Sequence, residues 1–116
     1  MPGQDYTGGP EALAAFEELA RPFLALGARR GKMMGRLTLS VGCKMFACLD
    51  DGAVGFRLGR ESAAHAAALA PPGARIFTPG RSERGFADWV ALPLSVVEEW
   101  EPVALEAFRA AEPRAV

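Results

Sequence analysis

The apolar positions near the start of the chain recur at the spacing of an α-helix. Within residues 7–26, one apolar face is formed by Leu13, Phe16, Leu19 or Ala20, and Phe23. Gly9 and Pro10 suit the N-cap and the first helical position of this segment. Pro22 has no backbone N–H to donate, so we expect a kink or a break beside it.

The pattern then changes to an alternation of apolar and polar residues. Residues 35–41 place Leu37, Leu39 and Val41 on one face, which is typical of a half-buried strand. Residues 44–49 are apolar on both faces and predict an inner strand, with Phe46 in the core. A turn signal at 50–53 leads to a third strand over 54–58. Because the turns are short, the three strands should form an antiparallel meander.

The second half of the chain predicts two more helices and two more strands. Residues 59–73 are an alanine-rich helical segment, and 74–79 and 85–93 are strands joined by a polar loop. Ser95 and Glu98 have the spacing of a capping box, which predicts a last helix with Trp100 and Phe108 on its apolar side. The order helix, three strands, helix, two strands, helix predicts an α+β fold. Its two layers are an antiparallel five-stranded sheet and the helices packed on it.

Composition places this pattern in a single globular domain. The chain has 116 residues, 50% of them hydrophobic and 23% charged, so we expect one domain over 1–116 with its core at about 10–111. No apolar run approaches the ~20 residues of a membrane helix, so no membrane contact is expected. The first residues lack the basic and apolar regions of a signal peptide, and we therefore expect a cytoplasmic protein.

The net charge of −1 conceals an uneven distribution of charge. Residues 29–84 contain ten bases and four acids, whereas both flanking segments are acidic. One interpretation is that acidic helices and a basic sheet complement each other within the domain. The other is a contact with an anionic partner through Arg29, Arg30, Lys32, Arg36, Arg81 and Arg84. A nucleic acid held in this way would bind weakly, without regard to sequence, and with strong salt dependence.

The two cysteines lie in the most chemically suggestive stretch, residues 41–52. The pattern places Cys43 in a turn and Cys48 within the following strand, which does not favour a disulfide between them. A zinc site would need two further ligands, and the single histidine, His65, lies on a distant helix. We expect both thiols to be reduced, no metal or other cofactor to bind, and Cys48 to serve as a small core residue.

The remaining candidates for chemistry have simpler structural explanations. His65 has no nucleophile or second acid–base group beside it in the sequence, and we expect a solvated helix residue that pairs weakly with Glu61. Asp50 and Asp51 are typical of a turn, and Met33 and Met34 of core filling. Asp88 interrupts an apolar strand, and the sequence does not explain it. An enzyme is not predicted.

Two short motifs resemble a known family. Residues 32–35, Lys-Met-Met-Gly, and residues 42–49, Gly-Cys-Lys-Met-Phe-Ala-Cys-Leu, are similar to the K-M-F-G and G-x-K-x-F-A-x-L motifs of the TfoX N-terminal domain family and the related MmcQ/YjbR-like proteins. The likeness extends through Phe77 to Trp89. It implies a two-layer fold similar to the secretion-chaperone-like fold, without catalytic residues. It also implies a regulatory role, because TfoX-like proteins are associated with natural competence and YjbR-like ones have been suggested to bind DNA.

The sequence therefore predicts a non-enzymatic cytoplasmic module that acts in regulation through a protein or nucleic-acid contact. The alternative, of a different class, is a chaperone-like or small-ligand-binding module that uses a groove between helix and sheet. A contiguous basic surface would favour the first hypothesis, and an apolar concavity the second. The pattern does not decide between a monomer and a homodimer.

Overall fold

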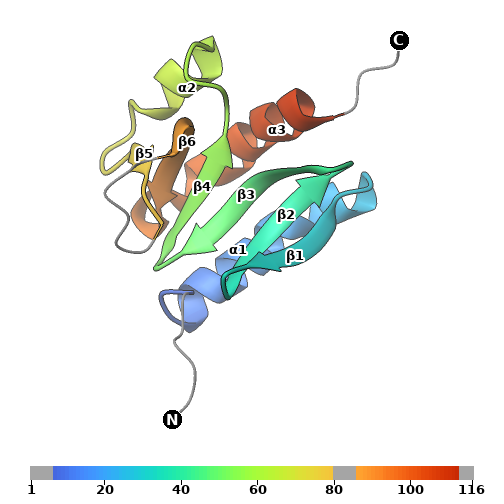
Figure 1. Ribbon diagram of the computed structural model, residues 1–116. Coiled ribbons are helices and arrows are strands. Elements are labelled where there is room, and N and C mark those ends of the chain that lie inside the picture. Colours follow the sequence, from blue (N-terminus) through green and yellow to red (C-terminus); the bar gives the residue numbers. More distant parts are fainter. Residues whose placement is uncertain (1–6, 80–85, 113–116) are drawn as a thin grey trace.

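The sheet of this α+β fold has six antiparallel strands among residues 7–79 and 86–112, the part of the chain that the computed structural model describes (Figure 1). The order across the sheet is β1-β2-β3-β4-β6-β5. The strands are β1 (Arg29–Met33), β2 (Arg36–Val41), β3 (Lys44–Asp50), β4 (Ala53–Arg57), β5 (Arg75–Phe77) and β6 (Phe86–Pro93). The α+β class and the antiparallel meander are confirmed, and the prediction of five strands is wrong by one.

The additional strand is β1, which forms a hairpin with β2. Residues 29–33 carry three bases and one apolar residue, so they have neither the alternation nor the apolar run by which other strands were predicted. Their pairing runs from Arg29 opposite Ser40 to Met33 opposite Arg36. Met34 and Gly35 form the turn with φ angles of 51° and 83°, the left-handed pair that is typical of a type I′ hairpin turn. The strand lies at the edge of the sheet and therefore needs no buried face of its own.

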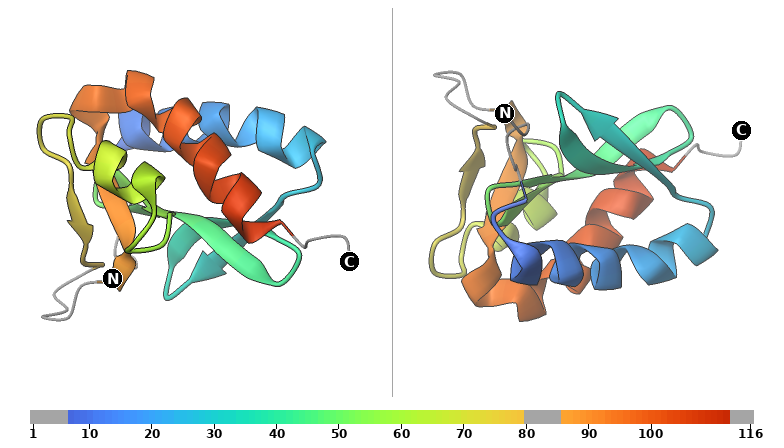
Figure 2. Two further views of the ribbon diagram at one scale, coloured as in Figure 1. Left: turned by 90° about the horizontal axis from the view of Figure 1, so that it is seen from above. Right: turned by 90° about the horizontal axis from the view of Figure 1, so that it is seen from below.

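The helices of the described chain lie on one side of the sheet. They are α1 (Pro10–Ala25), α2 (Ala63–Ala68) and α3 (Trp100–Ala111), with the 3₁₀ helix η1 (Leu94–Glu99) leading into α3. Helices α1 and α3 cross the same face, as Figure 2 shows from above and from below. The opposite face carries no helix among the described residues.

Three helical predictions need correction. Helix α1 does not break at Pro22 and continues to Ala25, because the proline lies in its last turn and removes only one of the final hydrogen bonds. The predicted capping box does not form, since Ser95 and Glu98 lie within η1 and α3 begins after Glu99 without a side-chain cap. Helix α2 is short, with Ser62 as its N-cap.

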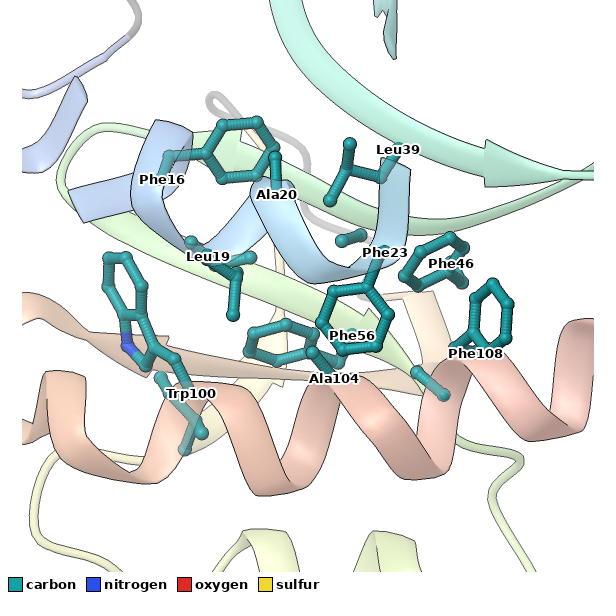
Figure 3. Close-up of a cluster of buried hydrophobic side chains, with 14 of the residues drawn as sticks. Phe16, Leu19, Ala20, Phe23, Leu39, Phe46, Phe56, Trp100, Ala104 and Phe108 are labelled. Carbon is teal, nitrogen blue, oxygen red and sulfur yellow. The ribbon is translucent and has the colours of Figure 1, made fainter. Parts of the chain in front are cut away.

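The main core lies between the helices and the sheet. The rings of Phe23, Phe46 and Phe108 meet with centroids 5.5–5.8 Å apart, joining α1, β3 and α3 (Figure 3). A bulge between β2 and β3 leaves Phe46 unpaired, because Leu39 and Ser40 lie opposite Ala47 and Met45. Phe46 and Ala47 consequently both turn toward the helices. Phe46 is fully buried, which confirms its predicted place in the core.

A second, smaller cluster lies on the face without helices. It consists of Cys48, Ala53, Phe77, Trp89 and Ala91, all of them buried. Phe77 lies directly over β4, where a Cβ atom added at Gly55 would come within 2.6 Å of its ring. The position therefore requires glycine because β5 packs its aromatic side chain against the backbone. This cluster explains why residues 44–49 are apolar on both faces.

Candidate interaction surfaces

The three exposed bases of β1 are divided between the two faces of the sheet. Arg29 lies opposite Ser40, on the face without helices, whereas Arg30 and Lys32 lie opposite apolar residues of β2 on the helix side. The Arg30 guanidinium forms an ion pair with Glu17 of α1. These bases share one edge, but they do not form one flat basic surface.

The predicted anionic contact also included Arg36, and the structure excludes that residue from an exposed patch. Arg36 is only 6% exposed, and its Nε donates to the Asp50 carboxylate over 2.7 Å. Its Nη1 donates to the Met34 carbonyl over 3.2 Å. The prediction for Arg36 is therefore wrong, because the charge is held inside the fold by a buried carboxylate. Arg81 and Arg84, the other two predicted contacts, lie outside the described residues.

Asp50 had been interpreted as part of a turn, and it has a second role. The turn itself is confirmed, since Asp51 and Gly52 have φ angles of 50° and 83°. Asp50, the last residue of β3, is 8% exposed and forms an ion pair with Arg36 of the neighbouring strand β2. The spacing of fourteen residues between the two charges offers no local signal in the sequence, so the pair could not be predicted.

His65 is a structural residue in a buried position. It is 7% exposed, and its Nε2 lies 2.9 Å from the Ala87 carbonyl, to which a protonated Nε2 donates. The expectation of a solvated residue paired with Glu61 is wrong. This hydrogen bond fixes α2 to β6. The backbone N–H of His65 donates to the Ser62 side chain, so both the side chain and the backbone of His65 stabilise the fold.

The polar residue Asp88 in the apolar strand β6 holds the connection between β4 and α2 in place. Its carboxylate accepts from the backbone N–H of Arg60 at 2.9 Å and from the Arg60 guanidinium at 3.0 and 3.3 Å. Its carbonyl accepts from the N–H groups of Leu58 and Gly59. The hydrogen bond from the Arg60 side chain, followed by that from the Arg60 backbone, lowers the pKa of Asp88 to about 2. Asp88 thus fastens the β4–α2 connection to β6.

The sulfur-containing residues divide between the surface and the core. Cys43 is exposed in the turn, and Cys48 is fully buried, as the sequence predicted for its place in the strand. Burial, with a smaller contribution from Asp50, raises the pKa of the Cys48 thiol to about 12. Met33 packs against the second cluster, but Met34 is 79% exposed at the hairpin turn, so its predicted core role is wrong.

A groove of about 480 Å³ runs between α2 and α3 on the helix side of the molecule. One wall is the alanine face of α2, and the other is a face of α3. It is lined by Leu58, Ala63, Ala64, Ala67, Ala68, Pro71, Glu99, Pro102, Val103 and Glu106. Its volume is within the range of ligand-binding clefts. The alternative hypothesis expected a groove between helix and sheet, and this one lies between two helices.

Two carboxylates accompany the apolar lining of this groove. Glu99, the last residue of η1, and Glu106 of α3 are seven residues apart, which corresponds to about two helical turns or ~10 Å. Both are exposed, and neither takes part in the ion pairs formed among residues 7–79 and 86–112. In the sequence, the signal for this wall of the groove is the spacing of residues 99, 102, 103 and 106, which is typical of residues on one side of a helix. The alanine wall of α2 had been interpreted only as a helix former.

Neither a metal site nor a membrane span is found in the described part of the chain. No group of three or more His, Cys, Asp or Glu side chains there could hold a metal ion. Among the same residues, no helix has both the length and the apolar character needed to cross a bilayer.

Comparisons of the chain with protein-family models, with curated proteins and with solved structures found no match. The site must therefore be interpreted from its own geometry.

Proposed function

We propose that this protein is a non-enzymatic interaction module, and that the α2–α3 groove binds a basic amphipathic helix of a partner protein. The observation that carries the proposal is an open apolar groove in which the wall formed by α3 and the end of η1 bears two carboxylates without an ion-pair partner among the described residues. A regulatory role in the cytoplasm, and the resemblance to the TfoX N-terminal domain family, remain part of this proposal.

The walls of the groove favour a helix as the occupant. Ala63, Ala64, Ala67 and Ala68 form one face of α2, and their small side chains allow another helix to approach closely. The opposite wall presents its residues with the i, i+3, i+4, i+7 spacing by which helices meet in grooves. An added helix would bury apolar surface on both walls, which supplies the favourable free energy of binding.

The carboxylates define the chemistry of that helix. A partner with lysine or arginine residues seven positions apart, beside its apolar face, would place a cation near each of Glu99 and Glu106. Exposed ion pairs of this kind add little affinity individually, about 0.2–1 kcal/mol. They mainly favour basic over acidic partners and set the orientation in which the helix binds.

A nucleic-acid contact has less support from the same geometry. Of the six predicted bases, Arg36 is buried in an ion pair and Arg30 is paired with Glu17. The helical side of the molecule carries the acidic residues of α3, which repel phosphate groups.

The test is a binding titration with a labelled synthetic helix of leucine, alanine and lysine, with its lysines seven residues apart. Wild type should bind it, and Ala67→Phe, which fills the groove from an exposed position, should weaken binding. Glu99→Lys/Glu106→Lys should weaken it by about tenfold or more, since two attractions become repulsions.

The matched control changes the same charge elsewhere on the same segment. Glu98→Lys/Glu112→Lys alters two exposed glutamates that do not line the groove. Binding by this variant should stay within about twofold of wild type, because charges outside the contact act only through screened, long-range attraction. Equal losses in both double variants, or an unchanged affinity in Ala67→Phe, would rule out the groove as the binding site.

A further inference from the structure

The exposed side of β1 offers a second surface, independent of the groove. Strand β1 is at one end of the sheet order and pairs only with β2 among the described residues (Figure 1). Arg29, Arg30, Gly31 and Lys32 are all exposed. An edge strand carries unpaired backbone N–H and C=O groups along its free side, and these can hydrogen-bond to an added strand.

We infer that this edge binds an acidic extended segment of a partner protein by strand addition. The charges of β1 support an acidic partner, since the strand contains three bases and no acid. They argue against a second copy of the same chain. Antiparallel or parallel pairing of two β1 strands would bring bases opposite bases, which is destabilising.

The way the charges are distributed distinguishes a strand from a nucleic acid. Arg29 is on the face without helices, and Lys32 is on the helix side. A phosphate backbone lying on either face would meet only one of them at close range. An added strand presents its side chains alternately to both faces, so acids three positions apart would meet Arg29 and Lys32 together.

Two exposed apolar residues mark the ends of this edge. Leu26 precedes the strand and is 61% exposed, and Met34 follows it and is 79% exposed. Met34 also adopts a φ of 51°, a backbone conformation for which glycine or asparagine would be less strained. Both apolar side chains therefore lie where they can contact a partner bound along this edge. The expected segment therefore has an apolar residue near each end and acids between them.

The probe is a synthetic peptide of about eight residues, enough to span the strand and its flanks at ~3.3 Å per residue. It carries two glutamates three positions apart in a threonine and valine background, with leucine at each end. A second peptide has the same side chains but alternate N-methylated amides, which cannot form the ladder of backbone hydrogen bonds. Labelled duplex DNA is the third probe.

Wild type should bind the first peptide at low salt, with slower hydrogen exchange of the β1 amides in the complex. The N-methylated peptide should bind at least about tenfold more weakly, and Arg29→Glu/Lys32→Glu should weaken the unmodified peptide by a similar factor. The control is Arg75→Glu, the same exchange on β5 at the opposite edge of the sheet, and it should leave the affinity unchanged.

Three results would overturn the inference. One is no binding of the unmodified peptide, and another is equal binding of both peptides, which would indicate attraction by charge alone. The third is DNA binding that Arg29→Glu/Lys32→Glu abolishes while the peptide does not compete. None of these results bears on the groove, because Glu99 and Glu106 are unchanged in every variant of this set.

Discussion

At the scale of single residues, Arg36 is the charge whose removal should affect stability most, although the sequence pattern had placed it on the surface. Arg36 lies on the polar side of the alternation in β2, but the residue is nevertheless only 6% exposed. The side chain is held there by Asp50 and by the Met34 carbonyl. A buried ion pair contributes little net stability as a whole, but the loss of one partner is costly.

We therefore expect Arg36→Ala to lower the free energy of unfolding by about 3–5 kcal/mol, because the Asp50 carboxylate remains buried without the guanidinium. Arg36→Met/Asp50→Leu should be much closer to wild type, since neither charge is left. Arg21→Ala is the surface control: its ion pair with Glu18 is exposed, and its loss should cost under about 1 kcal/mol. Urea denaturation of the four proteins measures all of these values. A double variant as unstable as Arg36→Ala would contradict the prediction.

Asp88 leads to a prediction about pH. Its folded pKa of about 2 lies below the ordinary 3.8, so the unfolded chain binds this proton more readily than the folded one. The stabilisation from ionised Asp88 is complete above that ordinary value and is lost as the pH falls from about 4 toward 2.

The melting temperature of wild type should fall more steeply across this window than that of Asp88→Asn. Identical slopes for wild type and Asp88→Asn would disprove the role of Asp88.

At the scale of elements, the core depends on three rings from three different elements. Phe46 contacts Phe23 of α1 and Phe108 of α3, and the bulge in β3 is what turns it toward them. Phe46→Ala removes this junction from a fully buried site, and we expect a loss of about 3–5 kcal/mol. Thermal unfolding should show the loss, while Met34→Ala, at a residue that is 79% exposed, should change stability by under about 1 kcal/mol. A shift of only a degree or two for Phe46→Ala would contradict its place in the core.

The elements also show what the sequence could and could not predict. Strand β2 was found from its alternation and β3 from its run of apolar residues, and helix α1 was found from the helical spacing of its apolar residues. Strand β1 was missed because an edge strand of bases has no such pattern, and the groove was missed because alanine carries no specific signal for binding. The role of Asp88 depends on Arg60, twenty-eight residues away, and only tertiary structure brings them together.

At the scale of the whole molecule, two ion pairs of the described residues join the basic central segment to the acidic segments on either side. Arg30 of the basic segment pairs with Glu17 of the acidic N-terminal helix, and Arg60 pairs with Asp88 of the acidic C-terminal segment. The first pair joins strand β1 to helix α1 and supports the interpretation that helices and sheet complement each other, whereas the second joins a loop to a strand. The exposed β1 bases Arg29 and Lys32, and the groove glutamates, are among the charges outside the ion pairs of the described residues.

The bases of β1 should also keep the molecule from associating with itself through its sheet. An edge strand without charges is a template for pairing with another chain, and lysine or arginine along the edge opposes this. We expect Arg29→Thr/Lys32→Thr to self-associate, because threonine favours strand pairing and the repulsion between edges is removed.

Sedimentation velocity over a range of concentrations should show wild type as a single monomeric species and the variant shifting toward larger species. Arg57→Thr, which removes an exposed base from the inner strand β4, should sediment as wild type does. If wild type itself dimerises at low salt, where the repulsion is strongest, then its interface lies elsewhere and the edge charges have no such protective role.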